Sequence, residues 1–243
     1  MDRQPELAYP VSTDEVRPVS KKGRTTSVSL VYQALRLDLI RARLEPGERL
    51  RIQDLSERYG CGVIPIREAL NRLASDGLVS YSEQRGFSAA MVSVSDALDI
   101  CRARVLMSDS ALRASIEQGD DAWEERVVLS YHRLKKVPRY ECLDPPTGNP
   151  EYDDPHRAFH TALISACGSQ RMIMLAEQLF VHAERYRYYA RRVLVADPDD
   201  DHRAVMDAAL ARNVDLALTL AKRHIEGPAN TLVEALRANT PVR

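Results

Sequence analysis

The chain has 243 residues, of which 28% are charged and 44% hydrophobic, as is usual for a soluble globular protein with one large domain or two smaller ones. Its formal net charge of −1 excludes a protein that binds nucleic acid through a strongly basic overall field. No apolar run reaches the length of a membrane span, and no signal peptide is recognisable. The four cysteines form no CxxC pair, so we expect reduced thiols and a cytoplasmic location.

Residues 1–26 are polar, contain three prolines and lack periodicity, so we expect a disordered tail. Its basic run Lys21-Lys22-Gly23-Arg24 would either follow a DNA backbone or be a floppy terminus. Between residues 27 and 92, nine Lys and Arg oppose eight Asp and Glu. DNA binding by this region would therefore depend on a few well-placed contacts and on dimerisation.

The stretch 27–92 predicts three helices and a hairpin. Helices are expected at 27–44 and 53–59, and Gly60 is a helix stop. Pro65 suits the first turn of a third helix, whose apolar residues recur at spacings of three and four. Strands are expected at 78–81 and 89–92, with Arg85-Gly86 at the tip between them. This order predicts a helix-turn-helix followed by a wing.

A helix-turn-helix places the start of its second helix in the major groove of DNA. Arg67 would then reach a phosphate or a guanine edge, and Val63 and Ile64 would meet thymine methyl groups. Arg85 at the hairpin tip suits the minor groove or the backbone. The alternative is a small helical hairpin with a solvated basic face. The candidate DNA-binding residues are Arg51, Gln53, Val63, Ile64, Arg67, Arg72, Arg85 and Gly86.

Several motifs in this stretch occur in a fixed order. They are Pro46-Gly47-Glu48-Arg49-Leu50, Leu55-Ser56-Glu57-Arg58, Pro65-Ile66-Arg67-Glu68-Ala69-Leu70 and Arg85-Gly86. With them the stretch resembles the winged helix-turn-helix of the GntR family of bacterial transcription regulators. The resemblance implies a regulator that binds double-stranded DNA. The family often has Ser-Arg-Thr before the proline, whereas Gly62-Val63-Ile64 stands here, so the operator does not follow from the resemblance.

After the wing the sequence predicts only helices, and residues 93–243 are expected to form a second domain. The expected helices span 95–118, 121–137, 154–167, 169–195, 200–212 and 213–238. The Pro-rich segment 138–155 is expected to be a surface loop, and Asp154-Pro155 to cap the helix that follows it. The expected fold class is mainly α, with an N-terminal winged helix-turn-helix at 27–92 and a C-terminal all-helical bundle.

Histidines recur on the apolar faces of three of these helices. His156 and His160 are four residues apart and share one face, and His202 and His224 each stand among apolar residues. The residues leave two readings open, a hydrogen-bonded core histidine on each segment and a metal ion shared by the three segments. Imidazole ligands favour zinc, then nickel, cobalt or copper, over magnesium or calcium.

Residues 95–238 resemble the helical effector-binding (FCD) domain of the FadR-type branch of the family. In many members an Asp, a His four residues later and two further His hold a metal. The resemblance therefore implies His160, His202 and His224 as ligands, with His156 in the place of the Asp. Four neutral imidazoles leave the full +2 of a divalent ion, which attracts anions.

The resemblance also implies a small organic-acid effector beside the metal. Arg104 stands where relatives carry an effector-contacting arginine, and a guanidinium can grip a carboxylate with two hydrogen bonds. The alternative for Arg104 is a salt bridge at the surface or between domains. The polar run 184–189 is expected to add groups to the pocket. The expected function is a repressor that acts as a homodimer on a palindromic operator.

Two other functions remain open from the sequence. A metal-dependent hydrolase would use the histidine site, but no glutamate lies between His156 and His160 and no general base adjoins them. A purely structural metal would stabilise the fold without any response to organic acids.

Overall fold

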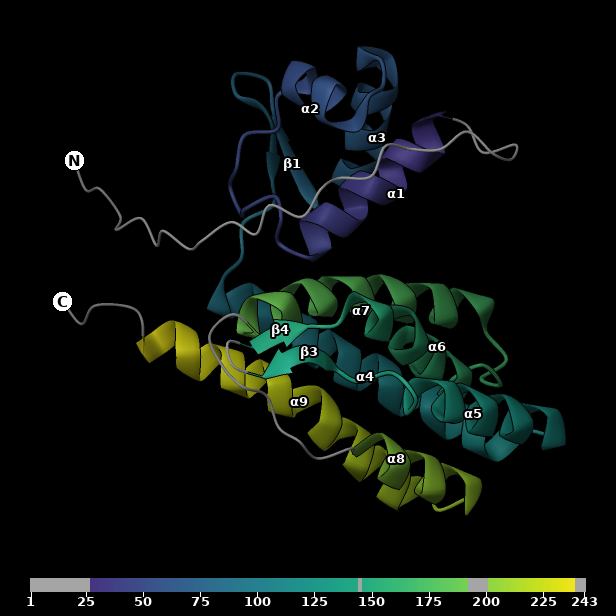
Figure 1. Ribbon diagram of the computed structural model, residues 1–243. Coiled ribbons are helices and arrows are strands. Elements are labelled where there is room, and N and C mark those ends of the chain that lie inside the picture. The colour runs from purple at the N-terminus through teal and green to yellow at the C-terminus, as the bar shows by residue number, and fades with distance from the viewer. Residues whose placement is uncertain (1–26, 144–145, 192–200, 239–243) are drawn as a thin grey trace.

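A computed structural model describes residues 27–143, 146–191 and 201–238. The expected disordered tail at 1–26 lies outside the described residues. The N-terminal helices and a two-stranded hairpin form one unit, and the remaining helices form a layered bundle below it (Figure 1). The prediction of a mainly helical chain with an N-terminal winged unit is confirmed.

The winged unit is built from α1 (Ser27–Ile40), α2 (Ile52–Tyr59), α3 (Val63–Ser75), β1 (Val79–Ser82) and β2 (Gly86–Ala89). Gly60 ends α2 in the left-handed conformation with φ 62°, as the sequence predicts. Four apolar residues of α3, Ile66, Ala69, Leu70 and Leu73, are fully buried, and the helix packs on α1, α2 and β1. The core of the unit includes Leu35, Leu39, Ile66, Ala69, Leu70, Leu73 and Leu78.

Two boundaries in the winged unit differ from the prediction. The first helix ends at Ile40 rather than at residue 44, because the chain turns at Ala42, whose φ is 55°. The second strand spans 86–89 rather than 89–92, since Ser82 pairs directly with Gly86. This register buries Phe87 and makes the turn at the tip of the wing shorter than expected.

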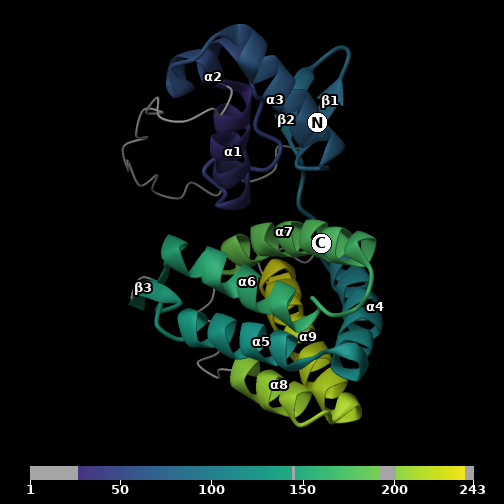
Figure 2. The ribbon, with the colours of Figure 1, turned by 90° about the vertical axis from the view of Figure 1, so that its right-hand side faces the viewer.

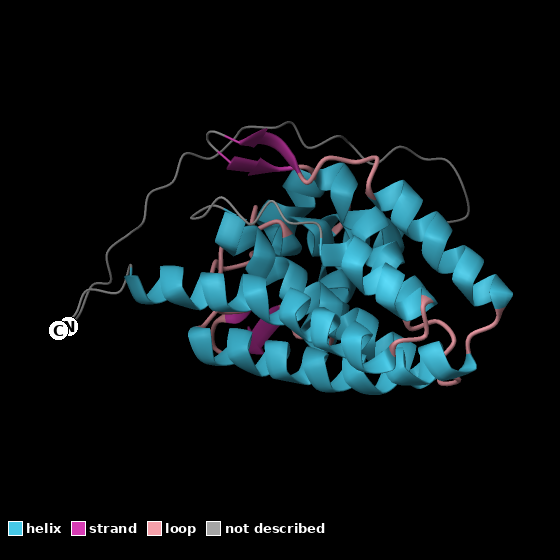
Figure 3. Cartoon of the chain, turned by 90° about the horizontal axis from the view of Figure 1, so that it is seen from below, coloured by secondary structure: helices cyan, strands magenta, loops and turns pink. Residues whose placement is uncertain are grey.

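The helical bundle contains α4 (Val94–Gln118), α5 (Asp121–Leu134), α6 (Asp153–Leu163), α7 (Gln170–Arg191), α8 (Asp201–Leu210) and α9 (Val214–Ala238). Figure 2 shows α9 in the middle of the bundle, where it packs on α4, α7 and α8, and Figure 3 shows the long helices running side by side. Their shared core includes Trp123, Phe159, Leu112, Ile116 and Ala209. None of the described helices has the length and apolar character that a membrane span requires.

The segment between α5 and α6 is not the plain loop that the sequence predicted. It forms an antiparallel pair, β3 (Tyr140–Leu143) with β4 (Pro146–Gly148), and a short 3₁₀ turn, η1 (Pro150–Tyr152). Asn149 stabilises this turn by accepting a hydrogen bond from the Glu151 amide and donating one to the Pro138 carbonyl. Helix α6 therefore begins at Asp153, and the prediction that Asp154 caps it is wrong.

Helix α7 joins the two units. It lies directly below the winged unit (Figure 2), and its Val181 belongs to the winged unit's core. His182 packs on Gly77, where a Cβ atom would lie 3.2 Å from the imidazole, and the Arg185 guanidinium donates to the Ala90 carbonyl. Tyr186 donates to Asp96 at 2.6 Å and accepts from the Ser93 amide at 3.1 Å. We call this set of contacts the domain junction.

Candidate DNA-binding surface, histidine cluster and pocket

The exposed face of α3 carries the residues expected to contact DNA. Ile64 is 76% exposed and Val63 43% exposed, although both are apolar, and Arg67 is also at the surface. Pro65 fits the first turn of α3, because a backbone N–H at this position would have no partner within the helix. A helix start that presents apolar and cationic side chains to solvent is suited to contacts in a DNA groove.

Four other DNA-binding candidates lie at the start of α2 and in the wing, next to α3, and Arg72 lies on α3 itself. Arg51 and Gln53 at the start of α2 and Arg85 at the wing tip are exposed, and Gly86 is half-buried in the wing turn with φ 72°. Arg72 has a different environment, because its guanidinium stacks on the Tyr32 ring of α1 at 4.2 Å. That stacking fixes Arg72 near the C-terminal end of α3, away from the end that carries Ile64.

The four predicted metal-ligating histidines lie together. One ring nitrogen from each of His156, His160, His202 and His224 lies within 4.8 Å of the other three. The Nε2 atoms of His156 and His160 are 3.1 Å apart, and those of His160 and His224 are 3.3 Å apart. Two ligands of a tetrahedral zinc ion with Zn–N bonds of about 2.05 Å are separated by about 3.3 Å. The four side chains therefore fit a shared divalent ion.

Burial favours the neutral form of His156, His160 and His224, and the neutral imidazole is the form that binds a metal. The pKa values of His156, His160 and His224 all lie well below the usual imidazole value, chiefly because the rings are removed from water. Neighbouring positive charges lower the pKa values further, above all Arg187 for His156 and the other histidines for His160 and His224. An ion held by these three rings would not have its charge neutralised by them.

A network of buried charges lies behind His156. Arg187 of α7 contacts the His156 Nδ1 atom at 2.6 Å and forms ion pairs with Glu184 at 3.0 Å and with Asp153 at 3.4 Å. Asp153 also accepts from Tyr188, and from Arg41, the residue that follows α1, at 3.4 Å. This network therefore extends from the histidine cluster to the winged unit.

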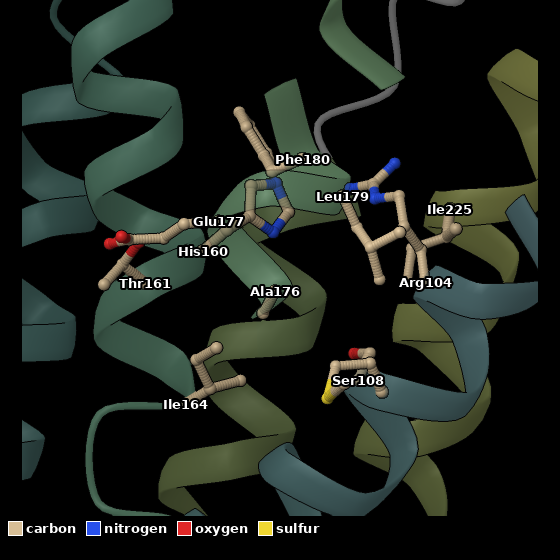
Figure 4. Close-up of a pocket in the computed structure, with 11 residues that line it drawn as sticks. Arg104, Ser108, His160, Thr161, Ile164, Ala176, Glu177, Leu179, Phe180 and Ile225 are labelled. Carbon is tan, nitrogen blue, oxygen red and sulfur yellow. The ribbon is translucent and has the colours of Figure 1, made fainter. Parts of the chain in front are cut away.

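A pocket opens beside the cluster, between α4, α6 and α7 (Figure 4). Its volume is about 60 Å³, and one water molecule needs at least about 10–15 Å³, so the pocket admits a molecule of only a few heavy atoms. In Figure 4, Arg104 and the pair Glu177 and Thr161 lie on opposite sides of the His160 ring. Apolar side chains including Met107, Ile164 and Leu179 make up much of the remaining wall.

Arg104 lines this pocket and packs its guanidinium over the Phe180 ring at 5.3 Å. Among the described residues no carboxylate pairs with it, so the salt bridge considered from the sequence is not found there. Burial, and next the charge of Arg187, lower the pKa of Arg104 to about 10. The side chain is still a cation at neutral pH, and its poor solvation favours an anionic partner.

Sequence reasoning missed Arg187, Asp153 and Glu184. It placed the run 184–189 at the pocket, whereas Glu184 and Arg187 lie behind His156, and Arg185 and Tyr186 lie at the domain junction. The one available signal was the i, i+3 spacing of Glu184 and Arg187, which is common on solvated helices and so carries little information. The expectation that His224 stands among apolar residues on a buried helix face is only partly right, because Leu216, two turns earlier on α9, is 46% exposed.

Two family comparisons cover most of the chain. Residues 28–88 match the family described as bacterial regulatory proteins, gntR family, and residues 99–227 match the FCD domain. "HTH-type transcriptional repressor GlaR" of Escherichia coli (strain K12) is 35% identical over 214 residues, covering 86% of this chain and 96% of the relative. "Uncharacterized HTH-type transcriptional regulator BphR" of Paraburkholderia xenovorans (strain LB400) is 36% identical over 219 residues, covering 87% of each.

Solved structures share the fold. E. coli McbR/YncC has a TM-score of 0.69 at 19% identity, covering 86% of this chain and 98% of that chain. A transcriptional regulator GntR from Rhodococcus sp. RHA1 also has a TM-score of 0.69, at 21% identity, covering 87% and 99% of the two chains. At these identities the likeness concerns the arrangement of helices and the winged unit.

Proposed function

This chain belongs to the GntR family of bacterial regulatory proteins and is a DNA-binding transcription regulator with an FCD domain. We propose that it is a homodimeric repressor controlled by a small organic acid. It is a regulator and not an enzyme, since its relatives are named as regulators, and the hydrolase alternative is set aside. We place the repressor in the cytoplasm, with domains at 27–92 and 93–243 as the sequence suggested.

For the DNA contact we propose that α3 enters the major groove and that the wing follows the neighbouring backbone. One short recognition helix distinguishes few base pairs, so two chains related by a twofold axis would read a palindromic operator. The exposed residues Ile64, Arg67 and Arg85 support this assignment, and Arg72 is proposed to contact phosphate from its position on Tyr32. Arg51, Gln53, Val63 and Gly86 complete the proposed surface.

The observation that carries effector control is the Arg104 guanidinium, which lines a small pocket and has no carboxylate partner among the described residues. A carboxylate at this position would satisfy the cation and stay within reach of His160. The proposed metal ligands are His156, His160, His202 and His224, with zinc as the first candidate ion. A bound divalent ion would supply positive charge that attracts the same carboxylate.

An effector can change operator binding only if it binds the DNA-competent and DNA-released states with unequal affinity. Helix α7 is suited to carry such a difference, because Phe180 lines the pocket while the neighbouring residues Val181 and His182 pack on the winged unit. We therefore propose that occupation of the pocket shifts α7 and, with it, the placement of the winged unit.

We expect Arg104→Met to abolish the response to organic acids, because the methionine keeps the bulk of the side chain but offers no hydrogen-bond donor. The measurement is a thermal-shift screen with formate, acetate, glycolate and lactate, acids of only a few heavy atoms, followed by operator binding with any acid that raises the melting temperature. The variant should bind the operator as wild type does without acid, yet remain bound when the acid is added.

Arg102→Met is the matched control for this experiment. Arg102 lies on the same helix, but its side chain is 75% exposed and pairs with Asp99. The control should respond to the acid as wild type does. An equal melting-temperature shift in the Arg104 and Arg102 variants would contradict the assignment of Arg104 to the effector.

We expect Ile64 to contact thymine methyl groups in the operator. Replacing thymine by deoxyuridine at the contacted position should lower the affinity of the wild-type protein about fourfold per half-site, which corresponds to one buried methyl group. The same replacement should have no effect on Ile64→Ala, and fluorescence anisotropy with the two duplexes measures both. A uracil penalty that persists in Ile64→Ala would assign the methyl contact to another residue.

A further inference from the structure

The contact between Arg187 and His156 determines which nitrogen of the histidine carries a proton. The Arg187 Nη1 atom lies 2.6 Å from His156 Nδ1, and both side chains are buried. A guanidinium has only donors, so Nδ1 must accept this hydrogen bond through its lone pair. An imidazole with a free lone pair on Nδ1 is neutral and carries its single proton on Nε2.

The Nε2 atom is also the nitrogen of His156 that faces the cluster. It lies 3.1 Å from His160 Nε2, so its proton is donated to that atom. A metal ion would need the lone pair of the same His156 Nε2 atom. With a metal on Nε2 the neutral ring carries its proton on Nδ1, and this N–H would point at the N–H of Arg187. Two donors that face each other at this distance repel.

We propose that the Arg187–His156 hydrogen bond and metal coordination by His156 exclude one another, so that Arg187 is a positioning residue that leaves His156 when the metal binds. The ring stays neutral throughout, since Nε2 gives its proton to solvent and Nδ1 takes one up. This inference rests on the proposed metal site. The exclusion is specific to a histidine at position 156. An aspartate there could bind the metal with one carboxylate oxygen and Arg187 with the other, so the two contacts would not compete.

The released Arg187 remains within the charge network. It already bonds Glu184 at 3.0 Å and the Oδ1 atom of Asp153 at 3.4 Å. The Oδ2 atom of Asp153 accepts from Tyr188 and from Arg41 of the winged unit. Movement of Arg187 therefore changes the surroundings of the Asp153 carboxylate, which also pairs with Arg41 of the winged unit. In this way the metal state of the cluster would reach the Arg41–Asp153 ion pair between the winged unit and the helical bundle.

Nitrogen-15 NMR of the histidine rings tests the proposal on the wild-type chain. The protein is stripped with a chelator, zinc is added stepwise, and the His156 signal is assigned from its loss in His156→Asn. We expect His156 to change from the Nε2–H to the Nδ1–H tautomer as zinc binds. A metal-free ring already in the Nδ1–H form, or a zinc-bound protein that keeps the Nε2–H form, overturns the proposal.

A pair of variants tests the same exclusion through affinity. Arg187→Met should raise zinc affinity about tenfold or more, because a charge-assisted hydrogen bond no longer competes for His156. In a His156→Asp background the same change should lower the affinity or leave it unaltered, since the carboxylate serves both partners. An equal gain in both backgrounds would show that only a general positive charge was removed, and would contradict the exclusion.

These experiments distinguish a failure of the proposed metal site from a failure of the proposed exclusion between Arg187 and the metal. Zinc binding without a tautomer change at His156 overturns the exclusion and leaves the metal site standing. Absence of zinc binding to the wild-type chain overturns the metal site, and the exclusion with it. Because the NMR experiment uses the wild-type chain, a folding defect of Arg187→Met cannot mask the result.

Discussion

Arg67→Ala is expected to weaken operator binding at least about thirtyfold and to leave the fold unchanged. A good contact between a side chain and a base edge contributes about 1–3 kcal/mol of discrimination, and a dimer loses it in both half-sites. The side chain is exposed and the core of α3 is formed by other residues, so the melting temperature should stay within error. Anisotropy with specific and scrambled duplexes, together with circular dichroism, gives both quantities.

Arg203→Ala is the control for the loss of one positive charge. Arg203 lies on α8, its side chain is 74% exposed, and it pairs with Asp207 on the same helix. This variant should bind the operator as wild type does. If both variants lost affinity equally, or if Arg67→Ala kept its footprint, the assignment of α3 as the recognition helix would be wrong.

Removal of one cluster histidine is expected to give the second large effect. The wild-type chain should hold about one zinc ion per chain, and His224→Ala should weaken zinc binding by more than about a hundredfold. Elemental analysis of the purified proteins gives the metal content, and competition with a chelator gives the affinity. A chelator should also lower the melting temperature of the wild type but not of the variant, because the ion binds the folded state alone.

His132→Ala is the matched control for the metal experiment, because His132 lies exposed on α5 away from the cluster. It should retain the full metal content. Equal metal content in all three proteins would contradict the proposed ligands. If chelation lowers the melting temperature while organic acids still fail to alter operator binding with the metal present, the metal is purely structural and effector control is wrong.

Helix α3 was predictable because its signals are local. Gly60 ends one helix, Pro65 suits the first turn of the next, and the three- and four-residue spacing of apolar residues identifies the buried face. The His156–His160 pair was predictable for the same reason, since i, i+4 residues share a face. Such features depend on neighbours in the sequence and need no knowledge of how distant segments pack.

Features that depend on long-range packing were not predictable. Arg187 looks like one polar residue of a surface run, and only the docking of α6 on α7 brings it to His156. The early end of α1 at Ile40 has no glycine or proline to mark it, because Ala42 takes up the positive φ. The β3–β4 pair lies in a Pro-rich segment that resembles a loop by composition. In each case tertiary contacts outweigh the local preference of the chain.

The central claim is that two copies of α3 read a twofold-symmetric DNA site, and selection from a random duplex library tests it most directly. The purified protein is incubated with the library, and the bound fragments are sequenced. We expect an inverted repeat with half-site centres about one helical turn apart, and no enrichment when Arg67→Ala is used. Absence of enrichment with the wild type, or the same motif from both proteins, would contradict the claim.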